Sequence, residues 1–383
     1  MPAPAGWTAY LPVTMPSGIV PANMPDAGNT FGPCPFIFNE NHPDWTAGKG
    51  AFLNSLAADA SDLRVFDPSD TYELPWGLQR LTQGDHPELI VGLGIPSTYP
   101  LLSASTTPLR LYRGCTGGTF EDKAGVVPVA DGNIGYYGMS DGTGGQLTDW
   151  TSNALHGTIA NASWVASSLG GWALNFDASN EVVRMGNPAA FRVQAWTYSV
   201  MVRCTNLTSV KFLFGTYDQN DASPYQGSNI LVGYQTTYDI LRGFFNTTPP
   251  QLYNQVPGTG YPLTVNQWAL ATFTRDAAGN VKLYLNGTEV ASGSYPGTVV
   301  YDNAYTSIGR IYTATGLGMI GDIGSVLVSG AVLSNNAVSA RANCLLNNAA
   351  AWTVGDEVAV GGGGPHIIVP AWGRRGPSLA GMR

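Results

Sequence analysis

Carboxylates are the first side chains to consider, because paired acids could give this chain of 383 residues a hydrolytic activity. A glycoside hydrolase places one acid and a second carboxylate on either side of the bond that it cleaves. Glu occurs at only seven positions, and no two Glu residues share the two-residue spacing that would bring them to one face of a strand. The sequence therefore predicts that the protein is not an enzyme and disfavours a polysaccharide-degrading activity.

Nucleophilic and metal-dependent catalysis lack their usual motifs as well. One G-x-S-x-G match occurs, at Gly138-Met139-Ser140-Asp141-Gly142. A nucleophile elbow needs a helix directly after its Ser, whereas the Gly-rich run that follows here favours a turn. The histidines show neither an HExxH motif nor another pair at metal-ligand spacing; they are His42, His86, His156 and His366.

A polar, tyrosine-rich segment within residues 215–263 is the best candidate for a ligand site. Sugars bind to a stacking aromatic ring together with hydrogen-bonding carboxylate and amide groups. The segment offers all three kinds of side chain, although a solvated loop with tyrosines at a sheet edge would have the same composition. The candidate ligand-binding residues are Tyr217, Asp218, Asn220, Asp221, Tyr225 and Tyr234.

Composition limits the possible folds and partners. Only 11% of residues are charged, and the chain contains 48 Gly and 26 Pro, which is typical of strands and turns rather than helices. The formal net charge is −8 and Lys occurs at only four positions, so no basic patch is available for nucleic acid or an anionic membrane. No apolar run is long enough for membrane insertion, and the N-terminus lacks the features of a secretory signal peptide.

Alternating side chains predict a strand meander at residues 268–290. Residues alternate in kind along 270–274 and again along 281–285, which gives each strand two unlike faces. Gly279 lies in the turn between them, and Asn286-Gly287 predicts a second tight turn. Such a meander must lay one face on another sheet to be stable.

This meander and its flanking segments resemble the laminin-G-like, concanavalin-A-like jelly roll over about residues 130–355. The matching segments are residues 170–185 (GGWALNFDASNEVVRM), 195–204 (AWTYSVMVRC), 268–290, 307–310 (SIGR) and 319–340. The chain departs from the family pattern at Ala178, where Gly is common, and at residues 321–324, where the acidic residue comes one place early. The resemblance implies that Trp268 is buried at the start of its strand, between the two sheets.

The same resemblance raises the possibility of one structural Ca²⁺ where early and late strands meet, bound by Asp oxygens and carbonyls. Turn-forming Asp residues would give the same pattern. The candidate metal ligands are Asp141, Asp177 and Asp322.

The preceding residues resemble a small β-domain of unknown function that precedes laminin-G-like domains in bacterial and phage surface proteins. The matching residues are Trp7, 35–37 (PFI), 62–66 (DLRVF), 73–75 (ELP) and 109–114 (LRLYRG). Pro12 favours an edge position for the first strand, because Pro cannot donate to a neighbouring strand.

The expected fold is therefore all-β, with two β-sandwich (jelly-roll) domains in tandem and a short extended C-terminal tail. The boundaries place the N-terminal β-sandwich at residues 1–129, the laminin-G-like jelly roll at 130–358, and a tail with a Gly hinge at 359–383. One disulfide in each domain, Cys34–Cys115 and Cys204–Cys344, is one possibility, and buried free thiols are the other.

The expected function is a non-enzymatic virion or cell-surface structural or adhesion protein, such as a phage fibre, spike or capsid-decoration subunit. Its partners would be other subunits of the same assembly, including copies of itself, and a cell-surface glycan. The alternative is a secreted bacterial carbohydrate-binding adhesin. The tail, whose residues 366–372 are apolar, is expected to join neighbouring subunits by adding to a sheet edge.

Overall fold

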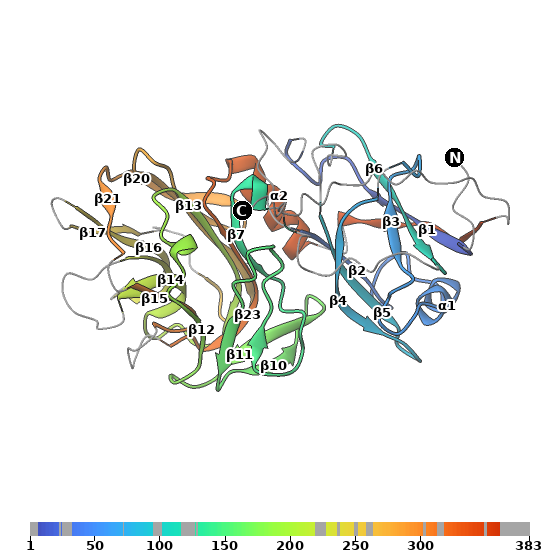
Figure 1. The fold of residues 1–383 in the computed structure, drawn as a ribbon, viewed down its shortest axis with the longest axis horizontal. Helices are drawn as coiled ribbons and strands as arrows, with labels where there is room; N and C mark the ends of the chain where they lie inside the picture. The colour runs from blue at the N-terminus through green and yellow to red at the C-terminus, as the bar shows by residue number, and fades with distance from the viewer. Residues whose placement is uncertain are drawn as a thin grey trace, which may run out of the picture.

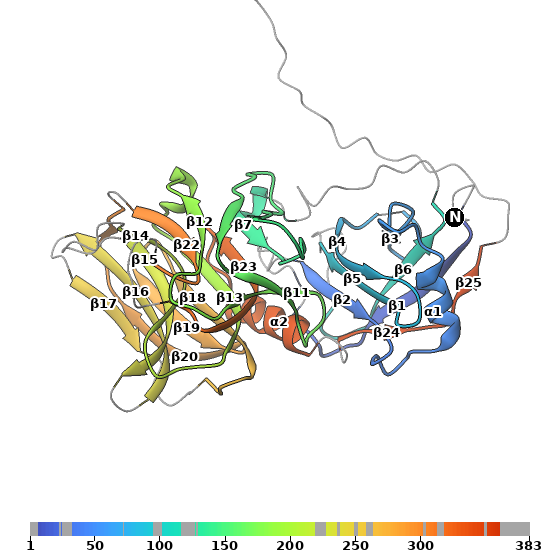
Figure 2. The ribbon, with the colours of Figure 1, turned by 90° about the horizontal axis from the view of Figure 1, so that it is seen from below.

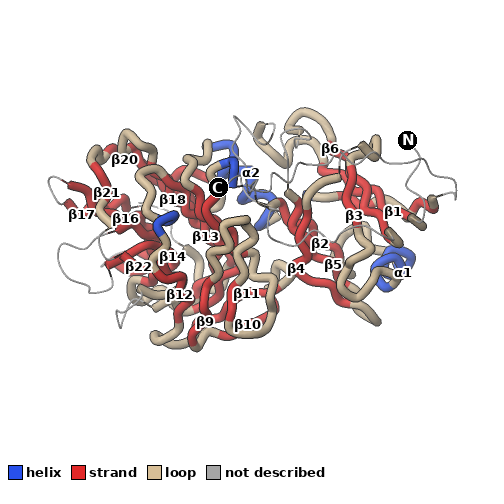
Figure 3. The backbone as a smooth tube through the Cα atoms, viewed as in Figure 1, coloured by secondary structure: helices blue, strands red, loops and turns tan. Residues whose placement is uncertain are grey.

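The computed structural model describes most of the chain as two β-rich units in contact (Figure 1). The described residues are 7–22, 24, 33–71, 73–94, 102–115, 127, 129–218, 227–235, 238–248, 252–257, 263–301, 304–311, 318–347 and 351–360. Antiparallel sheets dominate both units (Figure 3), which confirms the predicted all-β fold class. No helix among these residues is long and apolar enough to span a membrane.

The first unit, at the right of Figure 1, packs a five-stranded sheet and a three-stranded sheet around one apolar core. The larger sheet has the order β24-β1-β6-β3, with β25 also paired to β1, and the smaller has the order β2-β5-β4. Its elements are β1 (Ala9–Met15), β2 (Cys34–Phe38), α1 (Ala47–Asn54), β3 (Arg64–Phe66), β4 (Trp76–Thr82), β5 (Glu88–Leu93), β6 (Thr107–Arg113), β24 (Thr353–Val354) and β25 (Val358–Ala359).

β1 is an inner strand, so its predicted edge position was wrong. β6 pairs with one side of β1, and β24 and β25 pair with the other. Pro12 is tolerated because the ladder is interrupted opposite it, between β24 and β25, where the Gly355 amide donates to the Pro12 carbonyl over 2.8 Å. The C-terminal segment that covers this edge is more than 300 residues away in sequence, which local patterns do not reveal.

The second unit, the jelly-roll unit at the left of Figure 1, consists of two larger sheets packed face to face. The eight-stranded sheet has the order β10-β11-β23-β13-β18-β19-β20, with β7 paired to β23. The nine-stranded sheet has the order β17-β16-β15-β14-β22-β12-β9-β8, with β21 paired to β16. Figure 2 shows the two sheets from below.

The strands of this unit are bounded as follows: β7 (Asn133–Tyr137), β8 (Gln146–Leu147), β9 (Gly157–Ala160), β10 (Ser163–Ala166), β11 (Trp172–Phe176), β12 (Val182–Gly186), β13 (Trp196–Cys204), β14 (Lys211–Asp218), β15 (Gly227–Gln235), β16 (Tyr238–Thr248), β17 (Leu252–Pro257), β18 (Trp268–Arg275), β19 (Asn280–Leu285), β20 (Thr288–Ser294), β21 (Thr298–Val299), β22 (Ala304–Ile308) and β23 (Gly321–Ser329). Two short 3₁₀ helices, η1 (Val129–Asp131) and η2 (Ala189–Phe191), and the helix α2 (Asn335–Leu346) complete it. The predicted meander at residues 268–290 is β18-β19-β20, with positive φ at Gly279, Asn286 and Gly287 as its turns require.

The core between the two sheets is centred on Trp196, which is fully buried. Its ring stacks on Tyr198 of the same strand, with centroids 5.6 Å apart. Phe273 of β18 and Phe245 of β16 each meet it edge-on at 5.8 Å. Phe245 belongs to the opposite sheet, so Trp196 joins the two layers.

Trp268 does not lie in this core, which corrects the expectation from the resemblance. It is half-buried and packs with Leu270 in a separate cluster that includes Ala342 and Leu345 of α2. Along β18 the alternate residues Ala269, Ala271 and Phe273 face the sandwich core instead. Because strand side chains alternate, Trp268 must point to the outer face of the sheet.

α2 connects the two units by packing against both of them. Ser334 caps its N-terminus, accepting a hydrogen bond from the Ala337 amide over 3.0 Å. Val338 and Cys344 join the apolar core of the first unit, whereas Leu345 packs on the outer face of the jelly roll. Figure 1 shows the helix between the two units.

Trp150 of the jelly-roll unit inserts into the first unit against a pair of glycines. Gly77 of β4 lies directly opposite Gly92 of β5. A Cβ atom at Gly77 would lie 2.7 Å from the indole of Trp150, and one at Gly92 would lie 2.8 Å from it. Trp150 is fully buried and donates from Nε1 to Ser140 Oγ over 3.1 Å. The close fit requires glycine at both positions, so the two units share one packed interface.

Asp149 fixes the loop that carries Trp150. Its buried carboxylate accepts hydrogen bonds from the backbone amides of Tyr136, Thr151 and Leu155, at 3.0, 2.9 and 2.9 Å. Hydrogen bonds from several amides to one buried carboxylate hold a loop rigidly. The loop that carries Trp150 is thereby fixed by hydrogen bonds within the jelly-roll unit.

The C-terminal part of the chain returns to the first unit after α2. Residues 353–359 pair with β1, although the predicted boundary assigned residues up to 358 to the jelly roll. Lys49 Nζ donates to the Val354 carbonyl over 2.7 Å, and the Val354 amide donates to Asp44 over 2.8 Å, which secures β24. The Gly hinge and the apolar segment of the predicted tail, residues 361–383, lie outside the described residues.

Candidate ligand groove

The three predicted ligand-binding residues that the structure describes do not gather at one end of the sheet. Tyr217 and Asp218 end β14, where Tyr217 pairs with Gly227 and with Tyr305 of β22. Tyr234 lies near the end of β15, seven residues beyond Gly227, which corresponds to about 23 Å along a strand. The remaining three, Asn220, Asp221 and Tyr225, lie outside the described residues. The backbone register therefore separates Tyr234 from Tyr217 and Asp218.

The predicted metal ligands occupy three different settings. Asp322 is buried on β23 beside Arg203, whose Nε donates to its carboxylate over 2.6 Å, and Asn175 donates to it over 2.7 Å. Asp177 is exposed just after β11. Asp141 accepts from the amide and hydroxyl of Thr148 at 2.9 and 2.8 Å.

These partners do not fit a Ca²⁺ site. Arg203 already neutralises Asp322, and a second cation beside a guanidinium would be repelled. Among the described residues, no group of three His, Cys, Asp or Glu side chains has the spacing of a metal site. The three Asp residues are therefore interpreted as one ion-pair partner and two turn residues.

Chelation of divalent cations is expected to leave the stability of the protein unchanged, because Asp322 is held by Arg203 and Asn175 rather than by an ion. The measurement is the melting temperature with and without EDTA. A lower melting temperature in EDTA that Ca²⁺ restores would contradict this interpretation and return Asp322 to the metal ligands.

A groove of about 440 Å³ opens on the surface where β4 of the first unit lies beside Trp172 of the jelly roll. This volume is within the range of small-ligand sites in proteins. Its walls come from both units and from the loop after β7. The lining residues are Ala58, Asp59, Leu78, Gln79, Arg80, Leu81, Thr82, Ser140 and Trp172.

Trp172 is the aromatic element of the groove and is held in place from two directions. The guanidinium carbon of Arg80 lies 4.9 Å from the centre of its ring, at cation–π distance. A Cβ atom at Gly142 would lie 2.6 Å from its Nε1, so only glycine leaves room for the indole there. Trp172 is half-buried. The ring is a fixed, partly solvated apolar surface.

The charge of Arg80 is already balanced within the protein. Its Nε lies 3.1 Å from Glu88, and Asn39 donates to the other carboxylate oxygen of Glu88 over 2.9 Å. Arg80 also donates to the Gly171 carbonyl over 3.4 Å, beside Trp172. Arg80 therefore orients the indole, and its own charge is not available to attract an anionic ligand.

The other polar groups of the groove are an amide, two hydroxyls and one carboxylate. Gln79 and Thr82 belong to β4, and Ser140 belongs to the jelly-roll unit. The side-chain hydroxyl and backbone amide of Ser61 hold the pKa of the exposed Asp59 below its usual value, so this carboxylate is ionised at neutral pH. An aromatic ring beside amide, hydroxyl and carboxylate groups is the combination that sugars use.

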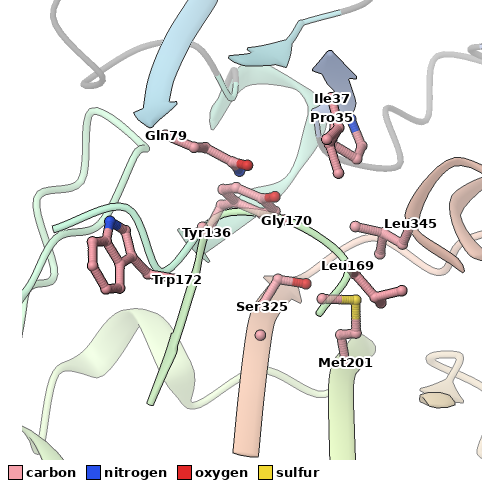
Figure 4. A pocket seen from close by; sticks show the side chains of 12 residues that line it. Pro35, Ile37, Gln79, Tyr136, Leu169, Gly170, Trp172, Met201, Ser325 and Leu345 are labelled. Carbon is pink, nitrogen blue, oxygen red and sulfur yellow. The ribbon is translucent and has the colours of Figure 1, made fainter. Parts of the chain in front are cut away.

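Behind the groove, a second cavity of about 20 Å³ lies between the units, with room for about one water molecule. Gln79 and Trp172 line both spaces. Figure 4 shows this inner cavity with Gln79 and Tyr136 on one side and Met201 and Leu345 on the other. The inner cavity is too small for an organic ligand, so the outer groove is the candidate site.

Sequence reasoning missed this groove because its walls are distant in the chain. Arg80 and Trp172 are 92 positions apart, and no local pattern predicts their contact. The available signals were the Gly170-Gly171-Trp172 sequence before a strand and the Gly142 turn that accommodates the indole. The G-x-S-x-G match lies in irregular chain after β7, with positive φ at Met139 and Gly142, and the described residues directly after it form bends rather than a helix.

Comparisons with known proteins identify the fold of the second unit. Residues 177–339 match a family model described as the concanavalin A-like lectin/glucanases superfamily. No curated protein matches the chain.

Three solved structures illustrate the likeness. Domain 4 of a GH43 extracellular arabinanase from Geobacillus stearothermophilus, in complex with arabinotriose, is 19% identical with a TM-score of 0.43, over 55% of this chain and 98% of that domain. The botulinum neurotoxin serotype G binding domain is 15% identical with a TM-score of 0.41, over 55% of this chain and 50% of that one. The Trypanosoma rangeli sialidase in complex with the inhibitor DANA is 13% identical with a TM-score of 0.40, over 56% of this chain and 33% of that one.

The chain thus spans about half the length of the toxin binding domain and a third of the sialidase. Residues 177–339 are similar to the concanavalin A-like lectin/glucanase superfamily, which bears out that part of the resemblance seen in the sequence.

Proposed function

We propose that the protein is a non-enzymatic surface protein that binds an uncharged or weakly charged saccharide in the groove between its two units. The observation that carries the proposal is the fixed, half-buried Trp172 in the wall of an open groove that amide, hydroxyl and carboxylate groups also line. A planar apolar ring matches the C–H face of a sugar, and the polar groups match its hydroxyls.

The acids of the groove argue against hydrolysis. Among the described lining residues Asp59 is the only carboxylate, and Glu88 next to them is held by Arg80 and Asn39. Both known geometries of glycoside hydrolysis need two carboxyl groups about 5–9.5 Å apart across the sugar. Binding without cleavage is the function that these residues support, and we expect no release of reducing ends from polysaccharides.

As part of this proposal, the protein is a subunit of a virion or of a cell-surface assembly, together with copies of itself or other subunits. The resemblance of residues 1–129 to a domain found in phage and bacterial surface proteins supports this setting. A secreted bacterial adhesin with the same groove is the alternative. Mass spectrometry of purified phage particles would separate the two, since an adhesin would be absent from them.

Replacing Trp172 with alanine is expected to weaken saccharide binding at least tenfold, because losing a central aromatic anchor costs about 2 kcal/mol or more. A glycan array with the intact protein identifies the best saccharide, and calorimetric titration then compares the variants. Trp164→Ala is the matched control, since Trp164 is also half-buried and lies on the neighbouring strand β10, outside the groove.

Equal loss of binding in Trp164→Ala and Trp172→Ala would show a general effect on folding rather than a binding role. Unchanged binding in Trp172→Ala would exclude the groove. In that case Tyr217→Ala and Asp218→Ala would test the sequence-predicted site at the end of β14.

A further inference from the structure

Two cysteines from different units meet in the shared core. Cys34 begins β2 in the first unit, and Cys344 lies on α2, 310 positions later in the chain. Both side chains are buried, with exposed fractions of 0% and 1%. They belong to one apolar cluster, at the contact between β2 and α2, and the Cys344 thiol is close enough to raise the pKa of Cys34.

The surrounding contacts hold the two thiols at this position. Trp352 donates from Nε1 to the carbonyl of Pro35, next to Cys34, over 2.9 Å. Asn343, next to Cys344, donates to the Ile19 carbonyl of the first unit over 2.8 Å. These bonds hold the backbone next to each cysteine, and α2 itself packs against β2.

The other two cysteines lie in different clusters. Cys115 lies in an aromatic cluster with Phe66 and Tyr112, and Cys204 lies in the core of the jelly roll. Neither cluster contains a second cysteine among the described residues. The pairs considered from the sequence, Cys34–Cys115 and Cys204–Cys344, would each join side chains from separate clusters.

We propose that Cys34 and Cys344 form a disulfide that links the two units when the chain folds under oxidising conditions. A disulfide requires two thiols that can approach with Cα atoms about 4.4–6.8 Å apart, and the packing of α2 against β2 brings these two buried residues into one cluster. The bond would join the N-terminal part of the first unit to the helix that closes the jelly roll.

The reaction needs a disulfide oxidant such as oxidised glutathione. The thiolate of one cysteine attacks a sulfur of glutathione disulfide, forming a mixed disulfide and releasing one reduced glutathione. The second cysteine thiolate then attacks the mixed disulfide at the first cysteine, and the second glutathione leaves. The two cysteine sulfurs are oxidised, one disulfide is reduced, and both cysteine protons remain on the two glutathione thiols.

The buried setting determines when the bond forms. Burial and the Cys344 thiol raise the pKa of Cys34, against a smaller opposite effect of Arg341 on α2. Little thiolate is therefore present in the folded state, and both sulfurs are shielded from glutathione. We expect the bond to form during folding and to persist afterwards.

The test is refolding of the reduced, denatured protein in a mixture of reduced and oxidised glutathione, followed by alkylation and tryptic digestion without reductant. Trypsin cleaves after Lys49, Arg341 and Arg374, so a Cys34–Cys344 bond joins the peptides 1–49 and 342–374. The expected result is this linked pair in the mass spectrum, with Cys115 and Cys204 alkylated. The oxidised protein should also migrate faster than the reduced protein on a non-reducing gel.

Variants separate this pair from the others. Cys34→Ser and Cys344→Ser should each lose the fast-migrating species, whereas Cys115→Ser, the matched buried control, should keep it. Alkylation of all four cysteines in the refolded wild type would overturn the proposal, as would linked peptides that contain Cys115 or Cys204. The wild-type peptide map decides the question even if a serine variant does not fold.

Discussion

Trp150→Ala is expected to lower the free energy of unfolding by about 3–5 kcal/mol, in the range found for buried large-to-small substitutions. Trp150 is fully buried between the units, against Gly77 and Gly92. Removing the indole leaves a cavity beside two residues that have no side chains with which to fill it. The hydrogen bond from Nε1 to Ser140, a residue of the groove, is lost as well.

Urea denaturation followed by circular dichroism measures this effect, with Trp164→Ala as the half-buried control. Gly92→Ala tests the same contact from the other unit, because its new methyl group would lie 2.8 Å from the Trp150 ring. Both Trp150→Ala and Gly92→Ala should shift the unfolding midpoint much more than Trp164→Ala. A Gly92→Ala variant as stable as the wild type would mean that the two units do not pack in this way.

Trp196→Ala is expected to cost a similar amount, about 3–5 kcal/mol, because it removes the ring that joins the two sheets of the jelly roll. Four aromatic or cationic neighbours would lose their contact with it: Tyr198, Phe245, Phe273 and Arg275. The first of these contacts is a stacked pair, and aromatic pairs contribute about 0.5–1.5 kcal/mol beyond the buried area.

Two further variants make this prediction specific. Trp196→Phe should be much less destabilising, since it keeps an aromatic ring and removes a buried indole N–H that has no hydrogen-bond partner. Trp268→Ala should also cost less than Trp196→Ala, because Trp268 is half-buried on the outer face. If Trp268→Ala proved the more destabilising of the two alanine variants, the assignment of Trp196 to the centre of the sandwich would be wrong.

The strands of the jelly roll could be predicted from the sequence because their signals are local. Alternation along residues 270–274 and 281–285 and the turns at Gly279 and Asn286-Gly287 indicate strands and hairpins directly. Alternation shows that a strand has two faces but does not show which face meets the other sheet. The family resemblance places Trp268 inside, whereas in the structure its neighbours Ala269 and Ala271 face the core.

Features that depend on distant parts of the chain could not be predicted in this way. The pairing of residues 353–359 with β1, the contact of Trp150 with two glycines and the approach of Arg80 to Trp172 each join segments 58 or more positions apart. The ligand groove follows from these contacts. The sequence instead predicts a site at Tyr217 and Asp218, because these residues lie close to Asp221 and Tyr225 along the chain. The composition of a segment is visible in the sequence, whereas contacts between distant segments are not.

A crystal structure of the protein with the best saccharide from the glycan array tests the central claim most directly. We expect density for the sugar in the groove between β4 and Trp172, with one ring face against the indole and hydroxyl groups within hydrogen-bonding distance of Gln79 and Asp59. The bound sugar should be uncleaved. Density at the β14 end near Tyr217, or anywhere else with the groove empty, would contradict the claim that the junction of the two units is the binding site.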